Sequence, residues 1–171
     1  THHIYYWPNF LPVFEELKKR NNYLIEASIP VRSSKNEFNA LRMICSTLNI
    51  NFIESDSEIN RIKKIKSKKY DVIIVGNVGQ LNKLVNNNTI AVMVYHGIGL
   101  KQSYYNDIDE RIDLRSVESA GRYEELQKLG HDNIVLTGFT KLDRLKTINK
   151  SEINLAREKL DLDTNQKTVL F

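Results

Sequence analysis

The alternation of short β-rich runs with helical segments constrains the fold of this chain more than any other feature. Runs of apolar, β-branched and aromatic residues occur at 3–6, 23–28, 50–53, 71–75, 89–95, 112–117 and 133–137. A helical pattern or a short loop separates each run from the next. Such βαβ repetition is typical of a parallel sheet with both faces covered. The sequence therefore predicts an α/β fold with a Rossmann-like parallel sheet flanked by helices.

The spacing of apolar residues predicts the helices between these runs. Leu11 and Leu17 belong to one apolar stripe, and comparable stripes recur further along the chain. Gly130 is expected to end a helix over 118–129, and Ser151 is expected to cap the last helix. These signals place helices on both sides of the predicted sheet.

The length of the chain limits it to one full domain. With 171 residues, of which 41% are hydrophobic, we expect a single core. We assign residues 1–150 to a Rossmann-like domain. Residues 151–171 are then a helix, a linker and the start of a second domain, because the run 167–171 looks like the opening of a strand.

The single cysteine and the apolar runs bear on where the protein is located. Cys45 lies among apolar residues at helical spacing, so we interpret it as core rather than as a nucleophile or a disulfide partner. The longest strongly apolar runs, 72–75 and 90–94, are far too short to span a bilayer, and nothing at the start resembles a secretory leader. A cytoplasmic location is expected.

A basic amphipathic helix over 57–67 leaves two interpretations open. It carries Ile59, Ile62 and Ile65 on one side and several lysines elsewhere. Such a helix could dock on an anionic membrane surface, which would make the protein peripheral at the inner face of the cell membrane. The charged outer face of an ordinary α/β domain has the same pattern.

A candidate site follows the apolar run 90–94. His96, Gly97, Gly99 and Lys101 come directly after this run, where a buried strand would end. The carboxyl ends of parallel strands are where open α/β sheets bind ligands. Glycines let a backbone approach a ligand, imidazole exchanges a proton near neutral pH, and an ammonium group balances phosphate charge. The segment indicates a phosphate-handling site, although a histidine at a strand end can also simply bond to a neighbouring loop.

Other site classes fit the sequence poorly. A dinucleotide fingerprint would need a third glycine where the chain has Gln102, and it should follow the first strand. No Walker loop and no nucleophile elbow is present. His2, His3 and His131 are interpreted as surface residues, so no metal site is predicted. The net charge of +4 favours anionic ligands, but without interleaved aromatic and basic residues we expect no nucleic-acid partner.

Two segments in the same order resemble a known family. HGIGLK at 96–101 and TGFTKLDRL at 137–145, together with the strand-like KTVLF at the end, resemble the CDP-glycerol glycerophosphotransferases of teichoic acid and capsule synthesis. The family often has Gly-Tyr-Pro-Arg-x-Asp where this chain has GFTKLD at 138–143. That departure leaves the acceptor and the subgroup open.

The resemblance implies a fold and a reaction. The family has a GT-B fold of two Rossmann-like domains, and this chain looks like its N-terminal, acceptor-side half. A second catalytic histidine and most of the CDP-glycerol site would then lie in the other domain, and this chain alone would be inactive. His96 would be the general base that takes a proton from an acceptor hydroxyl. The implied residues for substrate and phosphate binding are Gly97, Gly99, Lys101, Thr137, Gly138 and Asp143.

The partners implied by the resemblance are substrates rather than cofactors. They are a nucleotide-activated polyol phosphate donor and a lipid-linked or polymer acceptor. Lys101 can equally be a solvated loop residue, and Asp143 a first-turn helix acid favoured by the helix dipole. Another GT-B enzyme, such as a sugar transferase or a sugar-nucleotide epimerase, and a non-catalytic α/β ligand-binding module remain the alternatives. The sequence leaves the oligomeric state open.

Overall fold

The computed structural model describes residues 3–77, 81–97, 111–163 and 165–169, and it divides the chain into two compact units, Thr1–Lys141 and Leu142–Phe171. The elements of the first unit begin with the 3-10 helix η1 (Ile4–Tyr6) and continue as α1 (Trp7–Lys19), β1 (Glu26–Ala27), α2 (Lys35–Leu48), β2 (Asn51–Phe52), α3 (Glu58–Ser67), β3 (Val72–Val75), α4 (Leu81–Leu84), β4 (Ile90–Val94), β5 (Leu114–Val117), α5 (Ala120–Lys128) and β6 (Ile134–Leu136). The 3-10 helix η4 (Thr140–Lys146) crosses the boundary between the units, and α6 (Lys150–Lys159) belongs to the second unit.

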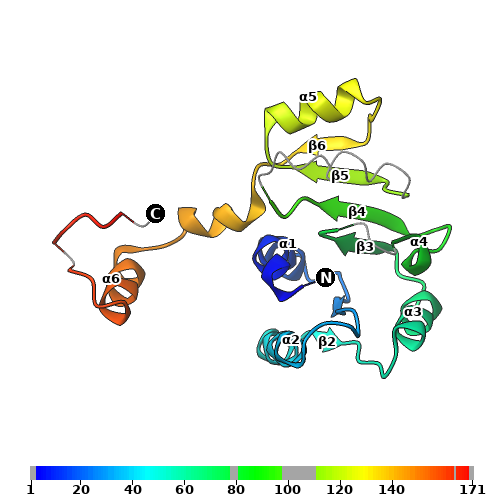
Figure 1. The fold of residues 1–171 in the computed structure, drawn as a ribbon, viewed down its shortest axis with the longest axis horizontal. Helices are drawn as coiled ribbons and strands as arrows, with labels where there is room; N and C mark the ends of the chain where they lie inside the picture. Colours follow the sequence, from blue (N-terminus) through cyan, green and yellow to red (C-terminus); the bar gives the residue numbers. More distant parts are fainter. Residues whose placement is uncertain (1–2, 78–80, 98–110, 164, 170–171) are drawn as a thin grey trace. The chain divides into compact units, whose positions relative to one another are not determined.

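Four strands form one parallel sheet in the order β3-β4-β5-β6. Figure 1 shows them as neighbouring arrows, with α1 beside β3 and β4. The short strands β1 and β2 pair in parallel as a separate two-stranded sheet. Because every pairing is parallel and helices flank the strands, the α/β fold predicted from the sequence is confirmed.

The predicted first strand is wrong. Residues 3–6 belong to a helical turn instead, in which the Tyr6 amide donates to the His3 carbonyl at 3.1 Å, and α1 begins at Trp7. Pro8 lies in the first turn of α1, where its fixed φ favours a helix start. The aromatic residues in this turn pack against other aromatic rings of the domain. Their β propensity is therefore overridden by tertiary contacts.

Side-chain caps set several helix starts. Ser34 and Glu37 form a capping box at α2, and Ser119 caps α5. Gly130 follows α5 with a φ of +88°, as expected of a helix stop. At α6 the prediction was wrong, because Asn149 rather than Ser151 is the N-cap. Residues 167–169 of the predicted last strand have no regular structure, and the rest of that run lies outside the described residues.

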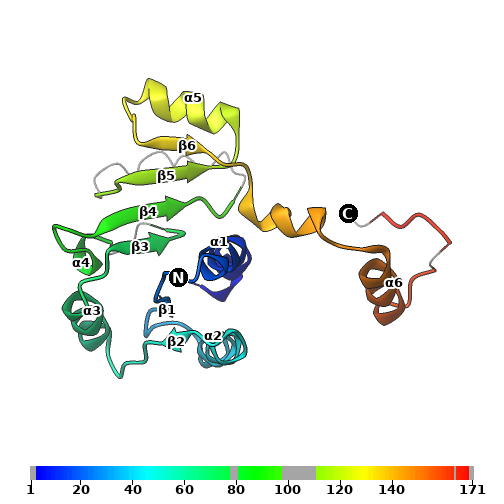
Figure 2. The ribbon, with the colours of Figure 1, turned by 180° about the vertical axis from the view of Figure 1, so that it is seen from behind.

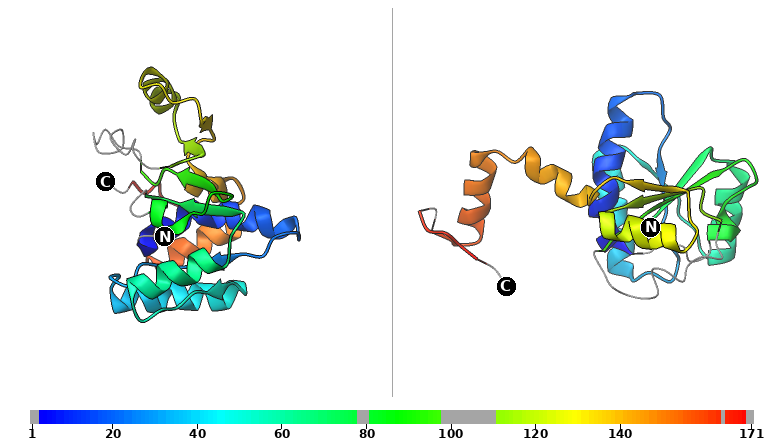
Figure 3. Two further views of the ribbon diagram at one scale, coloured as in Figure 1. Left: turned by 90° about the vertical axis from the view of Figure 1, so that its right-hand side faces the viewer. Right: turned by 90° about the horizontal axis from the view of Figure 1, so that it is seen from above.

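The described buried residues of the first unit gather in three clusters rather than in the single core expected. The largest contains Met93, Val117 and Leu126, between the four-stranded sheet and its helices. The right-hand view of Figure 3 shows α5, in yellow, lying alongside β6. A second cluster joins α1, α2 and the small sheet and contains Cys45, as predicted from its helical spacing. None of the described residues of η4 and α6 is buried.

The third cluster holds the apolar side of α3. Ile65 is buried there with Leu84, and Ile62 packs against them. Figure 2 shows α3 next to α4, near the tail of β4. The basic helix therefore uses most of its apolar stripe inside the domain. Among the described helices, none combines the length and the apolar character that a bilayer span requires.

Candidate functional site

His96 lies at the carboxyl edge of the sheet, directly beyond the end of β4. Its Nδ1 is 2.6 Å from the carbonyl oxygen of Gly76, the residue that follows the neighbouring strand β3. A carbonyl oxygen only accepts hydrogen bonds, so Nδ1 carries the proton. In the neutral ring Nε2 then bears the lone pair. The backbone of β3 thus selects the tautomer in which Nε2 is the basic atom.

Two tyrosines of η1 support the His96 ring. The ring centroids of Tyr6 and His96 are 4.1 Å apart with planes tilted by 35°, and Tyr5 meets the ring edge-on at 6.3 Å. The Tyr5 hydroxyl donates to the Tyr6 hydroxyl at 3.1 Å. Tyr6 is only 3% exposed, whereas Tyr5 is 60% exposed and His96 is half-buried. The imidazole therefore rests on a buried ring while remaining at the surface of the domain.

Gly76 leaves room for this stacking because it has no side chain. A Cβ built on Gly76 would lie 3.1 Å from Cζ of Phe10 and 3.3 Å from Cδ2 of Tyr6. These distances are shorter than ordinary van der Waals contact between carbon atoms. A glycine at this strand end thus lets η1 and α1 approach the carbonyl that holds His96.

Gly97 is fixed through its carbonyl group. Nη2 of Arg122, from the first turn of α5, donates to the Gly97 carbonyl at 3.3 Å. Nε of the same guanidinium donates to Oε1 of Glu118 at 2.9 Å. The side chains of Arg122 and Glu118 are 3% and 5% exposed, so this ion pair is buried. Gly99 and Lys101, the other residues predicted in this segment, lie outside the described residues.

Thr137 and Gly138 follow β6 at the same edge of the sheet as His96. Thr137 Oγ1 lies 2.7 Å from Ser116 Oγ, and Gly138 has a φ of +78°. One strand separates β4 from β6, so the ends of these two strands are about 10 Å apart. The sheet brings Thr137 to the same rim as His96 but not into contact with it. Asp143 belongs to the second unit and is exposed in η4.

Sequence reasoning missed the residues that hold His96 in place. Gly76 follows the apolar run 71–75, but it is 20 residues from His96 in the sequence. Tyr6 was assigned to a strand, so its stacking role was hidden. Arg122 and Glu118 are four residues apart, a spacing typical of a helical ion pair, and this signal could have found the pair but not its target.

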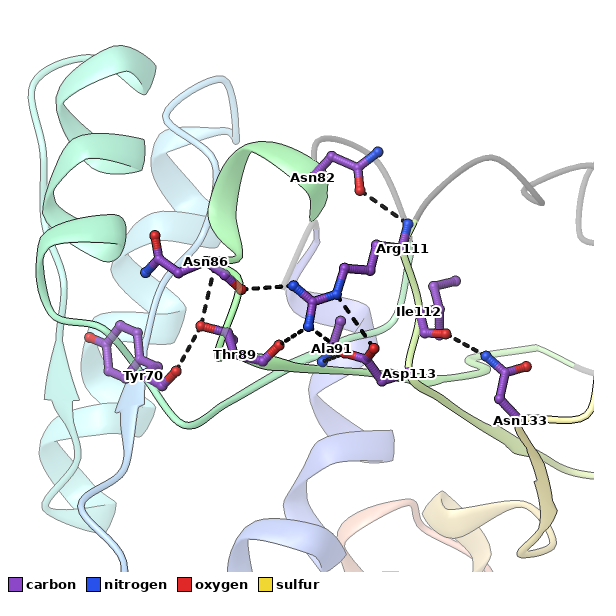
Figure 4. Close-up of polar contacts among 9 residues, drawn as sticks. All are labelled: Tyr70, Asn82, Asn86, Thr89, Ala91, Arg111, Ile112, Asp113 and Asn133. Atoms are coloured by element: carbon purple, nitrogen blue, oxygen red, sulfur yellow. Dashed lines mark hydrogen bonds and ion pairs between the residues drawn. The ribbon is translucent and has the colours of Figure 1, made fainter.

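A polar network at the opposite, amino edge of the sheet has a structural role. The Arg111 guanidinium donates to the Asn86 carbonyl at 2.8 Å and to the Thr89 carbonyl at 2.7 Å. Figure 4 shows both hydrogen bonds as dashed lines. Asp113 accepts from the Ala91 amide at 2.7 Å and pairs with Arg111. These contacts tie the loops that precede β4 and β5. Because its groups satisfy one another far from the strand ends that carry His96, we assign this network to stability.

A shallow hollow of about 650 Å³ lies elsewhere on the first unit. It is lined by residues of α2, α3 and the segment that follows β2, and His96 is not among them. Two of its charged residues are engaged, because Glu54 pairs with Arg42 and the Lys64 ammonium donates to the Glu54 carbonyl at 2.7 Å. The hollow therefore offers less reactive chemistry than the His96 edge. Within the described ranges, His, Cys, Asp and Glu side chains form no group of three suited to a metal ion.

Comparisons with protein-family models, with curated proteins and with solved structures found no match to this chain.

Proposed function

We propose that this chain is the acceptor-side domain of a glycerophosphotransferase that moves glycerol phosphate from CDP-glycerol to a hydroxyl of a lipid-linked or polymer acceptor. The observation that carries the proposal is the hydrogen bond between His96 Nδ1 and the Gly76 carbonyl. It leaves Nε2 as the base at a sheet edge where α/β proteins bind ligands. The resemblance of the segments at 96–101 and 137–145 to the family supplies the substrate class.

The reaction would need one proton transfer and one phosphoryl displacement. Nε2 of His96 takes the proton of the acceptor hydroxyl as its oxygen attacks the β-phosphorus of CDP-glycerol. The new P–O bond forms as the bond to the α-phosphate oxygen breaks, and CMP leaves with the electron pair of that bond. An imidazole suits this role because its ordinary pKa of about 6.5 keeps it largely neutral and still basic near pH 7.

The binding roles are proposed on the same basis. Phosphoryl transfer depends on placing the attacking and leaving groups in line and on balancing negative charge. Gly97 and Gly99 would allow close approach of the backbone, and Lys101 would supply positive charge. Thr137 and Gly138 would shape the rim at the end of β6. The binding role of Asp143 rests on the resemblance to the family alone.

The test is transfer of labelled glycerol phosphate from CDP-glycerol by the complete gene product that carries this chain. The decisive variant is His96→Asn, because an asparagine amide can still donate to the Gly76 carbonyl but provides no base. We expect its kcat to fall by about 10²-fold or more, the usual size of a lost general base. His131→Asn is the matched control, because His131 lies after α5 at the amino side of β6, and its turnover should be unchanged.

Three outcomes would contradict the proposal. The first is a His96→Asn protein with parental turnover, which would remove His96 from the chemistry. The second is transfer from a UDP-sugar with none from CDP-glycerol, which would favour the sugar-transferase alternative. No transfer from either donor class would favour a ligand-binding module.

A further inference from the structure

We propose that Arg122 is a positioning residue for His96, acting together with Glu118. This inference rests on the proposed function, since it assigns a role within the same site. A single guanidinium on α5 contacts both residues that flank His96. It lies 4.7 Å from the ring centroid of Tyr95, and its Nη2 donates to the carbonyl of Gly97. The backbone on either side of the imidazole is thus tied to one side chain.

The fold delivers Arg122 to this place through short local connections. β5 pairs with β4 in a register that sets Ser116 opposite Val94, two residues before His96. The chain leaves β5 at Val117 and enters α5, where the Ser119 hydroxyl accepts from the Arg122 amide at 3.3 Å. The first turn of α5 therefore lies beside the end of β4. Tyr95 is 2% exposed, so the guanidinium meets a ring that is itself fixed in the core.

The burial of the pair argues for a role beyond stability. Removing two charges from water is expensive, and replacing a buried ion pair by apolar residues is often neutral or stabilising. In the Arg122–Glu118 pair, hydrogen bonds offset the cost of removing the charges from water only in part. Oε2 of Glu118 is buried without a hydrogen-bond partner in the described part of the chain. A planar guanidinium can hold a carboxylate, a ring face and a carbonyl at once, which an ammonium group cannot. The pair is suited to orienting the backbone around His96.

The chain offers a matched control in α3. Arg61 is also buried, with a side chain that is 6% exposed, and pairs with Glu58 on its own helix. It also donates to Ser28 Oγ at 3.2 Å. Neither of these contacts involves the segment that carries His96. Arg61→Met therefore removes a buried helical ion pair of the same kind without disturbing the site.

The experiment compares Arg122→Met, Arg122→Lys and Arg61→Met in the complete gene product. For Arg122→Met we expect kcat for CDP-glycerol transfer to fall about tenfold or more while KM changes less than about threefold, since misplaced catalytic groups lower the rate of the chemical step. Arg122→Lys should recover part of this loss. Arg61→Met should lower the thermal midpoint while leaving kcat unchanged.

A second measurement reads the position of His96 directly. In protein labelled with 15N at histidine, the imidazole nitrogen shifts report the tautomer, and the His96 signal is identified by its absence from His96→Asn. The parent and Arg61→Met should show the Nδ1–H form, whereas Arg122→Met should show a mixture of tautomers. Should Arg122→Met fail to fold, Arg122→Lys decides, with an intermediate kcat and partial tautomer mixing expected.

The inference and the proposed function fail in different ways. Unchanged kcat together with an unchanged His96 spectrum in the Arg122 variants overturns the positioning role, even when His96→Asn is inactive. Parental turnover of His96→Asn overturns the proposed function itself.

Discussion

Substituting Gly76 by alanine tests whether the packing around His96 is as tight as the structure indicates. The added Cβ would meet Phe10 Cζ at 3.1 Å and Tyr6 Cδ2 at 3.3 Å, so both rings must move by a few tenths of an ångström. Phe10 is half-buried and can yield, but Tyr6 is 3% exposed and is stacked on His96. Relief of the contact therefore disturbs the ring that supports the imidazole.

Two opposing effects set the expected change in the free energy of unfolding of Gly76→Ala. Adding a methyl group to a filled site costs about 1–3 kcal/mol. Alanine also restricts the unfolded chain, which offsets this by about 0.4–1 kcal/mol. We expect Gly76→Ala to lower the free energy of unfolding by about 1–2 kcal/mol, measured by urea denaturation of the protein.

Alanine substitutions at two other glycines show what the change of backbone freedom does when no side chain is crowded. At Gly121 and at Gly130 an added Cβ would have no non-neighbouring atom of the described residues within 4 Å. Gly121→Ala lies within α5 and should stabilise by about 0.4–1 kcal/mol. Gly130→Ala should destabilise by about 1 kcal/mol, because a φ of +88° is strained for alanine even in open space.

A double variant identifies the steric cause. Leucine has no Cζ, so Gly76→Ala combined with Phe10→Leu should lose less stability than the sum of the two single changes. If Gly76→Ala is as stable as the parent, or if the two losses simply add, the close packing inferred around Gly76 is wrong.

Two further predictions concern His131 and Cys45, which lie outside the site. Partial burial, and secondarily the Arg115 guanidinium, lowers the pKa of His131 below its usual range. The contribution of neutral His131 to the free energy of unfolding is therefore complete above the unfolded-state pKa of about 6.5. That contribution is lost as the pH falls through the pKa of His131 in the folded protein. Urea unfolding between pH 7.5 and 5 should show a smaller loss of stability for His131→Asn than for the parent, and parallel curves would refute this. Burial raises the pKa of the Cys45 thiol to about 11, and the residue is 1% exposed. A thiol reagent at pH 8 should modify Cys45 on the order of 10²-fold more slowly in the native protein than in urea, and equal rates would place the thiol at the surface.

The elements predicted most accurately are those with the strongest local pattern. The apolar runs at 71–75 and 89–95 became β3 and β4, because strands buried on both faces read as continuous apolar sequence. The run at 3–6 was misread, because aromatic residues favour strands and core contacts equally. The N-cap of α6 was missed by two residues, since Asn149 and Ser151 are both good caps and only the observed capping box with Glu152 separates them.

Part of the candidate site could be predicted from the sequence, and part could not. A histidine after a buried strand was visible in the sequence, and the end of β4 carries it to the carboxyl edge of the sheet. The Gly76 carbonyl that selects its tautomer could not be seen, because a backbone group leaves no signature in the sequence. Arg122 is 25 residues from Gly97, and nothing in the intervening sequence indicates that the two meet.

By itself, the sequence determined the α/β class, the parallel direction of the strands and the edge of the sheet at which His96 lies. These properties depend on hydrophobic periodicity and on connection lengths, which are local. The tertiary structure alone decided which nitrogen of His96 is basic, which ring supports it and which guanidinium holds its neighbours. Those contacts join residues from separate elements, and they form only when burial of the apolar faces brings the elements together.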